Sequence, residues 1–168
     1  EFLELGHLLH ELRLFKSKDE VKLMQRAADI ACLAQVAAMR ATRHGAHEYE
    51  VEAALQFVYR MHDSVPAYEP IVGAGNNACV LHYRADAAPI RSGELVLIDA
   101  GCEVDGYASD ITRTFPANGK FTGPQRTLYD LVLASQDAAV AATKAGARFT
   151  DPHEATVAVL AQGLLDVG

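Results

Sequence analysis

The 168-residue sequence predicts a domain of the α+β class. Long segments with apolar residues at helical spacing flank a central stretch rich in strand-forming residues. That stretch contains Asp105-Gly106, a strong signal for a two-residue hairpin turn. A short motif also occurs twice, as Ala41-Thr-Arg-His-Gly-Ala46 and Ala142-Thr-Lys-Ala-Gly-Ala147. Helices combined with an antiparallel hairpin, in an order that recurs, indicate a two-part mixed architecture.

The composition excludes several functional classes. Half of the residues are hydrophobic and 22% are charged, which is ordinary for a globular protein. The formal net charge is −7, and no run of Lys or Arg occurs, so we expect no nucleic-acid partner. No apolar stretch approaches the ~18–20 residues of a membrane span, so we expect no membrane association.

The cysteines indicate the compartment. Cys32, Cys79 and Cys102 form no CxxC pair, and the sequence begins without a secretory signal pattern. An odd number of thiols without such a signal suggests reduced cysteines in the cytoplasm. We expect all three to be small core residues.

The first half of the chain begins with a connector and two helices. Residues 1–16 are expected to be a linker, and the capping-box pattern Ser17-Lys-Asp-Glu20 starts a helix that runs to about Arg43. Gly45 ends that helix, and a second one follows from about His47 to His62. The apolar positions expected on these helices are Val21, Met24, Ala28, Ala31, Leu33 and Ala38, then Val51, Leu55 and Val58.

Short strands and turns should follow. Tyr68–Val72 is expected to be a strand, Gly73-Ala-Gly-Asn-Asn77 a turn, and Cys79–Tyr83 a second strand with His82 near its end. Beyond the hairpin, the capping-box pattern Thr122-Gly-Pro-Gln125 starts a helix that reaches about Lys144. Asp151-Pro-His-Glu154 caps the last helix, with Pro152 at its first position.

The central hairpin carries the chemistry. If Asp105 and Gly106 form the turn, Asp99 lies opposite Thr112 and Asp110 lies opposite Gly101. Both aspartates then share one face, roughly 7–8 Å apart at the backbone. Two carboxylates on a mostly apolar hairpin repel and resist desolvation, so a metal ion between them is the simplest interpretation.

Two alternatives to the metal site remain. An odd-length loop or a β-bulge would place the two aspartates on opposite faces of the hairpin. One or both could also cap a turn or face solvent, as aspartate often does near strand ends.

The repeated motif extends the prediction. Each copy follows a long alanine-rich helix and precedes a shorter amphipathic one, which favours duplication over chance similarity. The spacing from Gly45 to Asp99, applied from Gly146, places a second hairpin at roughly position 200. The sequence reaches Gly168, so the repeat predicts an incomplete domain.

Several segments together closely resemble bacterial Xaa-Pro aminopeptidases, which belong to a metallopeptidase family with prolidase and methionine aminopeptidase. They are Arg13-Leu-Phe-Lys-Ser17, Ile71-Val-Gly-Ala-Gly75, Leu81-His-Tyr83, Leu97-Ile-Asp-Ala-Gly-Cys102 and Gly106-Tyr-Ala-Ser-Asp-Ile-Thr-Arg-Thr-Phe-Pro116. The resemblance implies the pita-bread fold, an α+β domain of two pseudo-symmetric halves. Residues 17–168 would form its first half plus the helices that open the second, and residues 1–16 would be a linker from a further amino-terminal domain.

The resemblance also implies a site. The family has a dinuclear centre with five protein ligands: two Asp, one His and two Glu. Asp99 would chelate one metal and Asp110 would bridge both, while His82 matches a histidine that contacts the substrate and assists catalysis. The family's metal-binding histidine and both glutamates have no counterparts in these 168 residues.

The implied activity is release of the amino-terminal residue from peptides with proline in second position, through a hydroxide that bridges two divalent ions, most commonly manganese. The full protein is expected to be a homo-oligomer. The 168-residue chain, with two of five ligands, is expected to hold metal poorly and to be inactive. The alternatives are a prolidase, which cleaves only dipeptides, and a non-catalytic binding module with the same fold.

Overall fold

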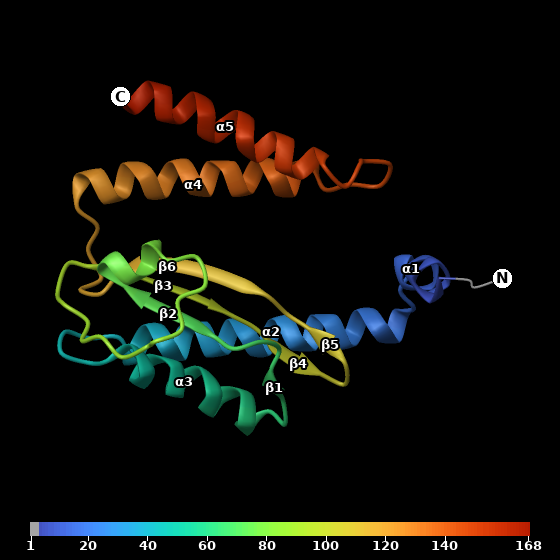
Figure 1. Ribbon diagram of the computed structural model, residues 1–168, viewed down its shortest axis with the longest axis horizontal. Coiled ribbons are helices and arrows are strands. Elements are labelled where there is room, and N and C mark those ends of the chain that lie inside the picture. The colour runs from blue at the N-terminus through green and yellow to red at the C-terminus, as the bar shows by residue number, and fades with distance from the viewer. Residues whose placement is uncertain (1–3) are drawn as a thin grey trace. The chain divides into compact units, whose positions relative to one another are not determined.

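The computed structural model describes residues 4–168, apart from the side chains of His7 and Leu8. The chain forms two compact units, residues 1–120 and 121–168 (Figure 1). Within residues 4–168, no helix has both the length and the apolar character needed to cross a membrane. The helices of the first unit are α1 (Leu5–Leu14), α2 (Lys18–Ala41), α3 (Glu48–Met61) and the 3₁₀ helix η1 (Gly75–Cys79). Its strands are β1 (Val65–Pro66), β2 (Ile71–Ala74), β3 (Leu95–Ala100), β4 (Cys102–Val104), β5 (Tyr107–Ala108) and β6 (Ile111–Pro116).

Helix α1 occupies most of the segment expected to be a linker. Residues 5–14 are helical rather than extended, while residues 1–3 of the same segment lie outside the described residues. Leu5, Leu9, Leu12 and Leu14 of α1 are exposed. The role of residues 1–16 as a linker stays a prediction.

Helix α2 begins as predicted, and two of its expected apolar positions, Ala31 and Ala38, are buried. The Ser17 hydroxyl accepts a hydrogen bond from the Glu20 backbone N–H, and Glu20 accepts one from the Ser17 N–H, completing the capping box. The buried face consists of Ala27, Ile30, Ala31, Ala34, Gln35 and Ala38. The expected positions Val21, Met24 and Leu33 are exposed, so that part of the prediction is wrong. The buried stripe of mostly small residues allows the helix to lie close to the sheet.

Helix α3 agrees with the prediction. Val51 and Leu55 are fully buried, and Val58 packs against the same core. The helix contacts α2 as well as β1 and β2. Gly45, with φ of +84°, allows the tight connection between the two helices.

The strands form two small antiparallel sheets, with orders β2-β3-β6 and β1-β4-β5. The predicted register is confirmed, because Asp99 pairs with Thr112 and Val104 pairs with Tyr107. Asp105 and Gly106 both have positive φ, +49° and +83°, as a type I′ turn requires. The loop is therefore of even length, which rules out the alternative that the two aspartates face opposite ways.

The hairpin is interrupted at Gly101. The strand expected from Glu94 to Glu103 is divided into β3 and β4, and residues 109 and 110 also lie outside the strands. A Cβ atom on Gly101 would overlap the carbonyl oxygen of Ser109, so only glycine permits this close approach.

The segment after β2 differs from the prediction. Residues 75–79 form η1 and residues 80–83 form a turn, so the strand expected over Cys79–Tyr83 is wrong. Strand β2 itself is shifted to Ile71–Ala74, beyond the expected Tyr68–Val72. Gly75, with φ of +55°, turns the chain out of the sheet immediately after β2.

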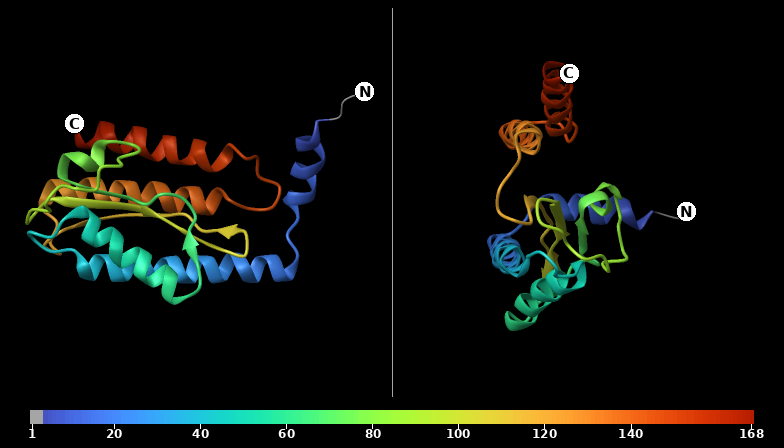
Figure 2. Two further views of the ribbon diagram at one scale, coloured as in Figure 1. Left: turned by 60° about the horizontal axis from the view of Figure 1, so that its bottom comes forward. Right: turned by 90° about the vertical axis from the view of Figure 1, so that its left-hand side faces the viewer.

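The core of the first unit lies between the two long helices and one face of the strands. Val72, Val96, Ile98, Ala100, Cys102 and Val104 are buried there against α2 and α3. The end-on view in Figure 2 shows α2 and the loop after β2 on opposite sides of the strands. Alternation along β3 places Asp99 on the face away from the helices. Cys102 is a core residue as predicted, but Cys32 and Cys79 are exposed, which corrects the prediction for those two.

The second unit is a pair of helices, α4 (Gly123–Ala142) and α5 (Asp151–Val167). The predicted Thr122 capping box is present. Asp151 is the first helical residue rather than the cap, and its carboxylate accepts from the Arg148 N–H in the preceding loop. Gly146 has φ of +85°, nearly the value at Gly45, so the repeated motif makes the same turn between helices in both units.

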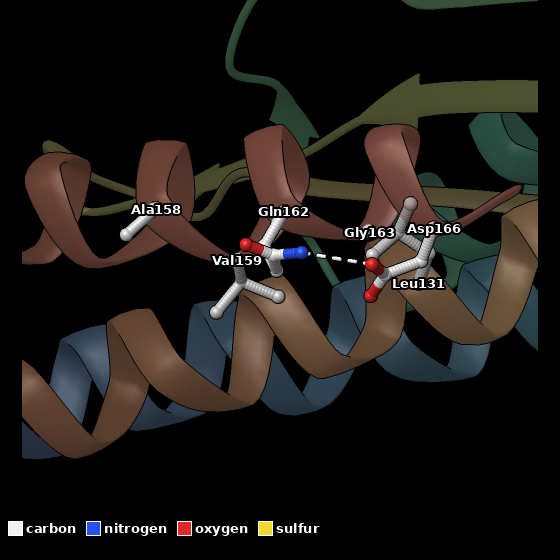
Figure 3. A pocket seen from close by; sticks show the side chains of 6 residues that line it. All are labelled: Leu131, Ala158, Val159, Gln162, Gly163 and Asp166. Carbon is white, nitrogen blue, oxygen red and sulfur yellow. Dashed lines mark hydrogen bonds between the residues drawn. The ribbon is translucent and has the colours of Figure 1, made fainter. Parts of the chain in front are cut away.

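A groove within the second unit is lined by residues of α5 and by Leu131 of α4 (Figure 3). A Cβ on Gly163 would overlap the Leu131 side chain, so glycine permits the close approach of the two helices. Gln162 donates to Asp166, the only carboxylate that lines the groove. Its lining residues are Leu131, Ala158, Val159, Gln162, Gly163 and Asp166.

Candidate metal centre

Asp99 and Asp110 converge on one point. The Tyr68 hydroxyl lies 2.6 Å from Oδ1 of Asp99 and 2.7 Å from Oδ1 of Asp110. Because both Oδ1 atoms lie within hydrogen-bonding distance of the same hydroxyl, the two carboxylates lie close together. Asp99 is half-buried and Asp110 is exposed. The structure thus brings together the two residues that the sequence predicted to share a face.

Backbone contacts place Tyr68 beside the carboxylates. Strand β1 pairs with β4, and the Ala67 N–H donates to the Gly101 carbonyl at 3.0 Å. This bond holds the segment between β1 and β2 next to Gly101, where the hairpin is interrupted. Sequence reasoning missed Tyr68 because its contacts depend on a two-residue strand that carries no distinct signal.

Ser109 holds Asp110 in position although neither residue belongs to a strand. The Ser109 N–H donates to the Cys102 carbonyl at 2.8 Å, and the Ser109 hydroxyl accepts from the Cys102 N–H at 3.0 Å. Ser109 is buried, and the missing Cβ of Gly101 leaves room for its carbonyl. The glycine and the serine together orient the Asp110 carboxylate toward Asp99.

The charges at this point are unbalanced. Burial, followed by the hydrogen bonds to Asp99 and Asp110, raises the pKa of Tyr68 well above its ordinary value, so the phenol stays protonated at neutral pH. One hydroxyl proton can serve only one carboxylate at a time. Within residues 4–168, no ion pair to a Lys, Arg or His compensates either aspartate. Two converging anionic oxygens without a counter-charge suit a hard divalent cation.

The donor set is small. No group of three or more His, Cys, Asp or Glu residues that could hold a metal occurs in the described part of the chain. The two carboxylates can contribute to a cation site but leave most of its coordination to other donors.

His82 lies outside this cluster. It is exposed in the turn formed by residues 80–83. Among the described side chains, no hydrogen bond joins it to Asp99, Asp110 or Tyr68. The structure therefore does not bring His82 to the aspartate pair, and its role stays a prediction.

Comparisons with known proteins point to one family. The model of metallopeptidase family M24 matches residues 22–167. The chain is 44% identical over 169 residues to a Xaa-Pro aminopeptidase of Haemophilus influenzae, covering 100% of this chain and 39% of that relative. The structure of Pseudomonas aeruginosa aminopeptidase PepP is similar, with a TM-score of 0.97 and 50% identity, over 99% of this chain and 38% of that one. A variant of Escherichia coli aminopeptidase P in complex with substrate has a TM-score of 0.93 and 42% identity, over 96% of this chain and 37% of that one.

Proposed function

The chain belongs to metallopeptidase family M24, and on this basis we propose that it forms part of a metal-dependent aminopeptidase for peptides with proline in second position. The similar structures have the pita-bread α+β fold, and this chain has the same fold over the part that it covers. The observation that carries the proposal is the convergence of Asp99 and Asp110 on one point with no counter-charge. The similarity to a Xaa-Pro aminopeptidase and to a substrate complex supports the peptide substrate.

Asp99 and Asp110 are the residues that would hold the metal. Two divalent ions, which we propose to be manganese because oxygen donors suit hard cations and the family that the sequence resembles commonly uses manganese, would supply Lewis acidity and lower the pKa of a water molecule when bound. The protein's part is to keep both carboxylates convergent. Gly101 and Ser109 orient Asp110, and the Tyr68 hydroxyl lies within hydrogen-bonding distance of both carboxylates and donates to one of them at a time.

His82 is proposed to bind the substrate and assist catalysis. It is exposed in the turn formed by residues 80–83. An imidazole can then donate to, or accept from, a peptide group of the substrate.

We further propose that this chain is one part of its catalytic domain. It covers 39% of its Haemophilus relative, and the described residues provide two carboxylates of the five ligands that the resemblance implies. Residues 17–168 would be the first half of the domain and the helices that open the second, with residues 1–16 as a linker. The isolated 168 residues would then be inactive. For the whole protein we propose a cytoplasmic location and a homo-oligomeric state.

The experiment uses the full-length protein, stripped of metal and then supplied with manganese. We expect it to release arginine from an Arg-Pro-Pro peptide, whereas the isolated chain should not. Asp99→Asn and Asp110→Asn should each lower kcat/KM by more than about a hundredfold. Replacing a residue that only supports a metal ligand typically lowers activity by about 10- to 100-fold, so loss of a ligand itself should cost more. Glu103→Gln, which removes an exposed carboxylate of the same hairpin, is the control.

Other results would overturn the proposal. Turnover of Xaa-Pro dipeptides alone would identify a prolidase. A full-length protein that binds manganese but cleaves neither substrate would be a binding module. Metal-dependent cleavage by the 168-residue chain would refute the proposed incompleteness of the site.

A further inference from the structure

We infer that Glu48 is a positioning residue whose buried carboxylate fixes the loop carrying His82 and acts on the reaction through that histidine. The inference rests on the proposed function, because the role of His82 belongs to it. Glu48 is the first residue of α3 and is 0% exposed. A fully buried carboxylate with no Lys or Arg partner among the described residues needs a specific set of hydrogen-bond donors.

Four donors surround the Glu48 carboxylate. Oε1 accepts from the Ala74 N–H at 2.8 Å and from the Asn77 side-chain amide at 2.9 Å. Oε2 accepts from the Tyr83 hydroxyl at 2.8 Å and from the Ala88 N–H at 2.9 Å. These five residues are called the Glu48 cluster below. The position of Glu48 in the first turn of α3 also stabilises the negative charge of its carboxylate.

Each of the four donors is held in its hydrogen bond to the Glu48 carboxylate. Burial, followed by the hydrogen bond to Glu48, raises the pKa of Tyr83, so its phenol remains a donor at neutral pH. The Ala74 and Ala88 donors are backbone groups, which cannot rotate away. The Asn77 amide also donates to the Tyr83 hydroxyl at 2.9 Å, which connects the two side chains of the loop. Because hydrogen bonds to a charged group are among the strongest, this cluster resists opening.

The Glu48 cluster encloses His82 in the sequence. Asn77 precedes the histidine and Tyr83 follows it directly, so both sides of the turn are attached to one carboxylate. The turn is closed by two backbone bonds, from the Val80 N–H to the Asn77 carbonyl and from the Tyr83 N–H to the Val80 carbonyl. The position of the His82 backbone therefore follows from the position of Glu48.

A second contact attaches the loop to the segment between β1 and β2, which also carries Tyr68. Arg84 forms an ion pair with Glu69, which is the residue after Tyr68. The loop that carries His82 is thus attached to α3 through Glu48 and to the β1–β2 connection through Arg84. Both attachments lie in the first unit, so together they can set the position of His82 relative to Asp99 and Asp110.

The test is a double-mutant cycle in the full-length, manganese-loaded protein. Glu48→Gln keeps the size of the side chain but turns one acceptor into an NH₂ group that faces a backbone N–H. We expect kcat/KM for Arg-Pro-Pro to fall about 10- to 100-fold, since small displacements of a reacting group cost that much. In the His82→Ala background, the same change should lower kcat/KM less than about twofold.

The matched control is Glu50→Gln. Glu50 lies in the same first turn of α3 and accepts from the His47 N–H at 2.7 Å, but it does not contact the loop. We expect Glu50→Gln to change kcat/KM by less than about twofold in either background. Equal losses from Glu48→Gln with and without His82 would show a merely structural role and overturn the inference.

Two further measurements keep the inference separable from folding and from the proposed function. Where Glu48→Gln does not fold, Tyr83→Phe removes a single donor of the cluster and enters the same cycle with the same expectation of non-additivity. Where the native protein cleaves no peptide, the proposed function fails, and amide hydrogen exchange still tests the cluster. Faster exchange across residues 74–88 in Glu48→Gln but not in Glu50→Gln supports it, and unchanged exchange overturns it.

Discussion

Replacing Asp86 by asparagine should stabilise the protein, but only above acidic pH. Asp86 is 8% exposed and faces Glu52 and Glu48, while the contact that favours its charged form is a long 3.4 Å hydrogen bond from the Val72 N–H. Burial is the main cause that raises its pKa from 3.8 to about 6, and repulsion from Glu52 and Glu48 adds to it. Asp86 also has a φ of +43°, a conformation that asparagine tolerates well.

The sign and size of the effect follow from proton linkage. Because the pKa of Asp86 is higher in the folded protein than in the unfolded chain, its contribution to stability is present below pH 3.8 and is lost as the pH rises through about 6. A difference of two pKa units corresponds to about 3 kcal/mol. Asparagine cannot ionise, keeps an oxygen for the Val72 N–H and can donate its NH₂ to Glu52. Asp86→Asn should therefore match the native protein near pH 4 and exceed its free energy of unfolding by about 2–3 kcal/mol at pH 7.

The assay is urea unfolding of the metal-free protein, followed by circular dichroism at several pH values from about 4 to 8. The control is Asp63→Asn, because Asp63 has a similar φ of +53° but is exposed. Its effect should be small and independent of pH, which separates the backbone preference from ionisation. A gain from Asp86→Asn that is equal at pH 4 and pH 7, or a loss at pH 7, would refute the reasoning.

Three further predictions concern the carboxylate pair. Gly101→Ala should lower the free energy of unfolding by about 3 kcal/mol, since its Cβ meets the Ser109 backbone, whereas Gly123→Ala, at a site with open space, should change it by less than about 0.5 kcal/mol; similar urea midpoints for both variants would contradict this. Tyr68→Phe should destabilise the metal-free protein by about 1–3 kcal/mol, because it removes the hydroxyl that both carboxylates use; an unchanged melting temperature would show that the contact contributes nothing. Manganese should raise the melting temperature of the native full-length protein but not that of Asp99→Asn, and an equal rise in both would place the metal elsewhere.

Local signals predicted much of the fold. The Ser17 and Thr122 capping boxes and the Asp105 turn are formed by residues within four positions of one another, so the sequence displays them directly. The register that pairs Asp99 with Thr112 follows from that turn. The expectation that Cys79–Tyr83 is a strand failed because an apolar run gives no information about partners farther along the chain.

The contacts that build the site connect distant positions. Tyr68 reaches Asp99 across 31 residues, and Glu48 reaches Ala88 across 40. Neither contact has a local pattern, because each depends on how a helix and two short strands pack.

The sequence by itself therefore determined helices α2, α3, α4 and α5, the hairpin register and the shared face of Asp99 and Asp110, since nearest-neighbour geometry governs all of them. Only the tertiary structure decided which hydroxyl lies between the two carboxylates, why position 101 requires glycine and how the loop that carries His82 is held. The physical reason is that buried polar groups take their partners from whatever segments the packed core brings together.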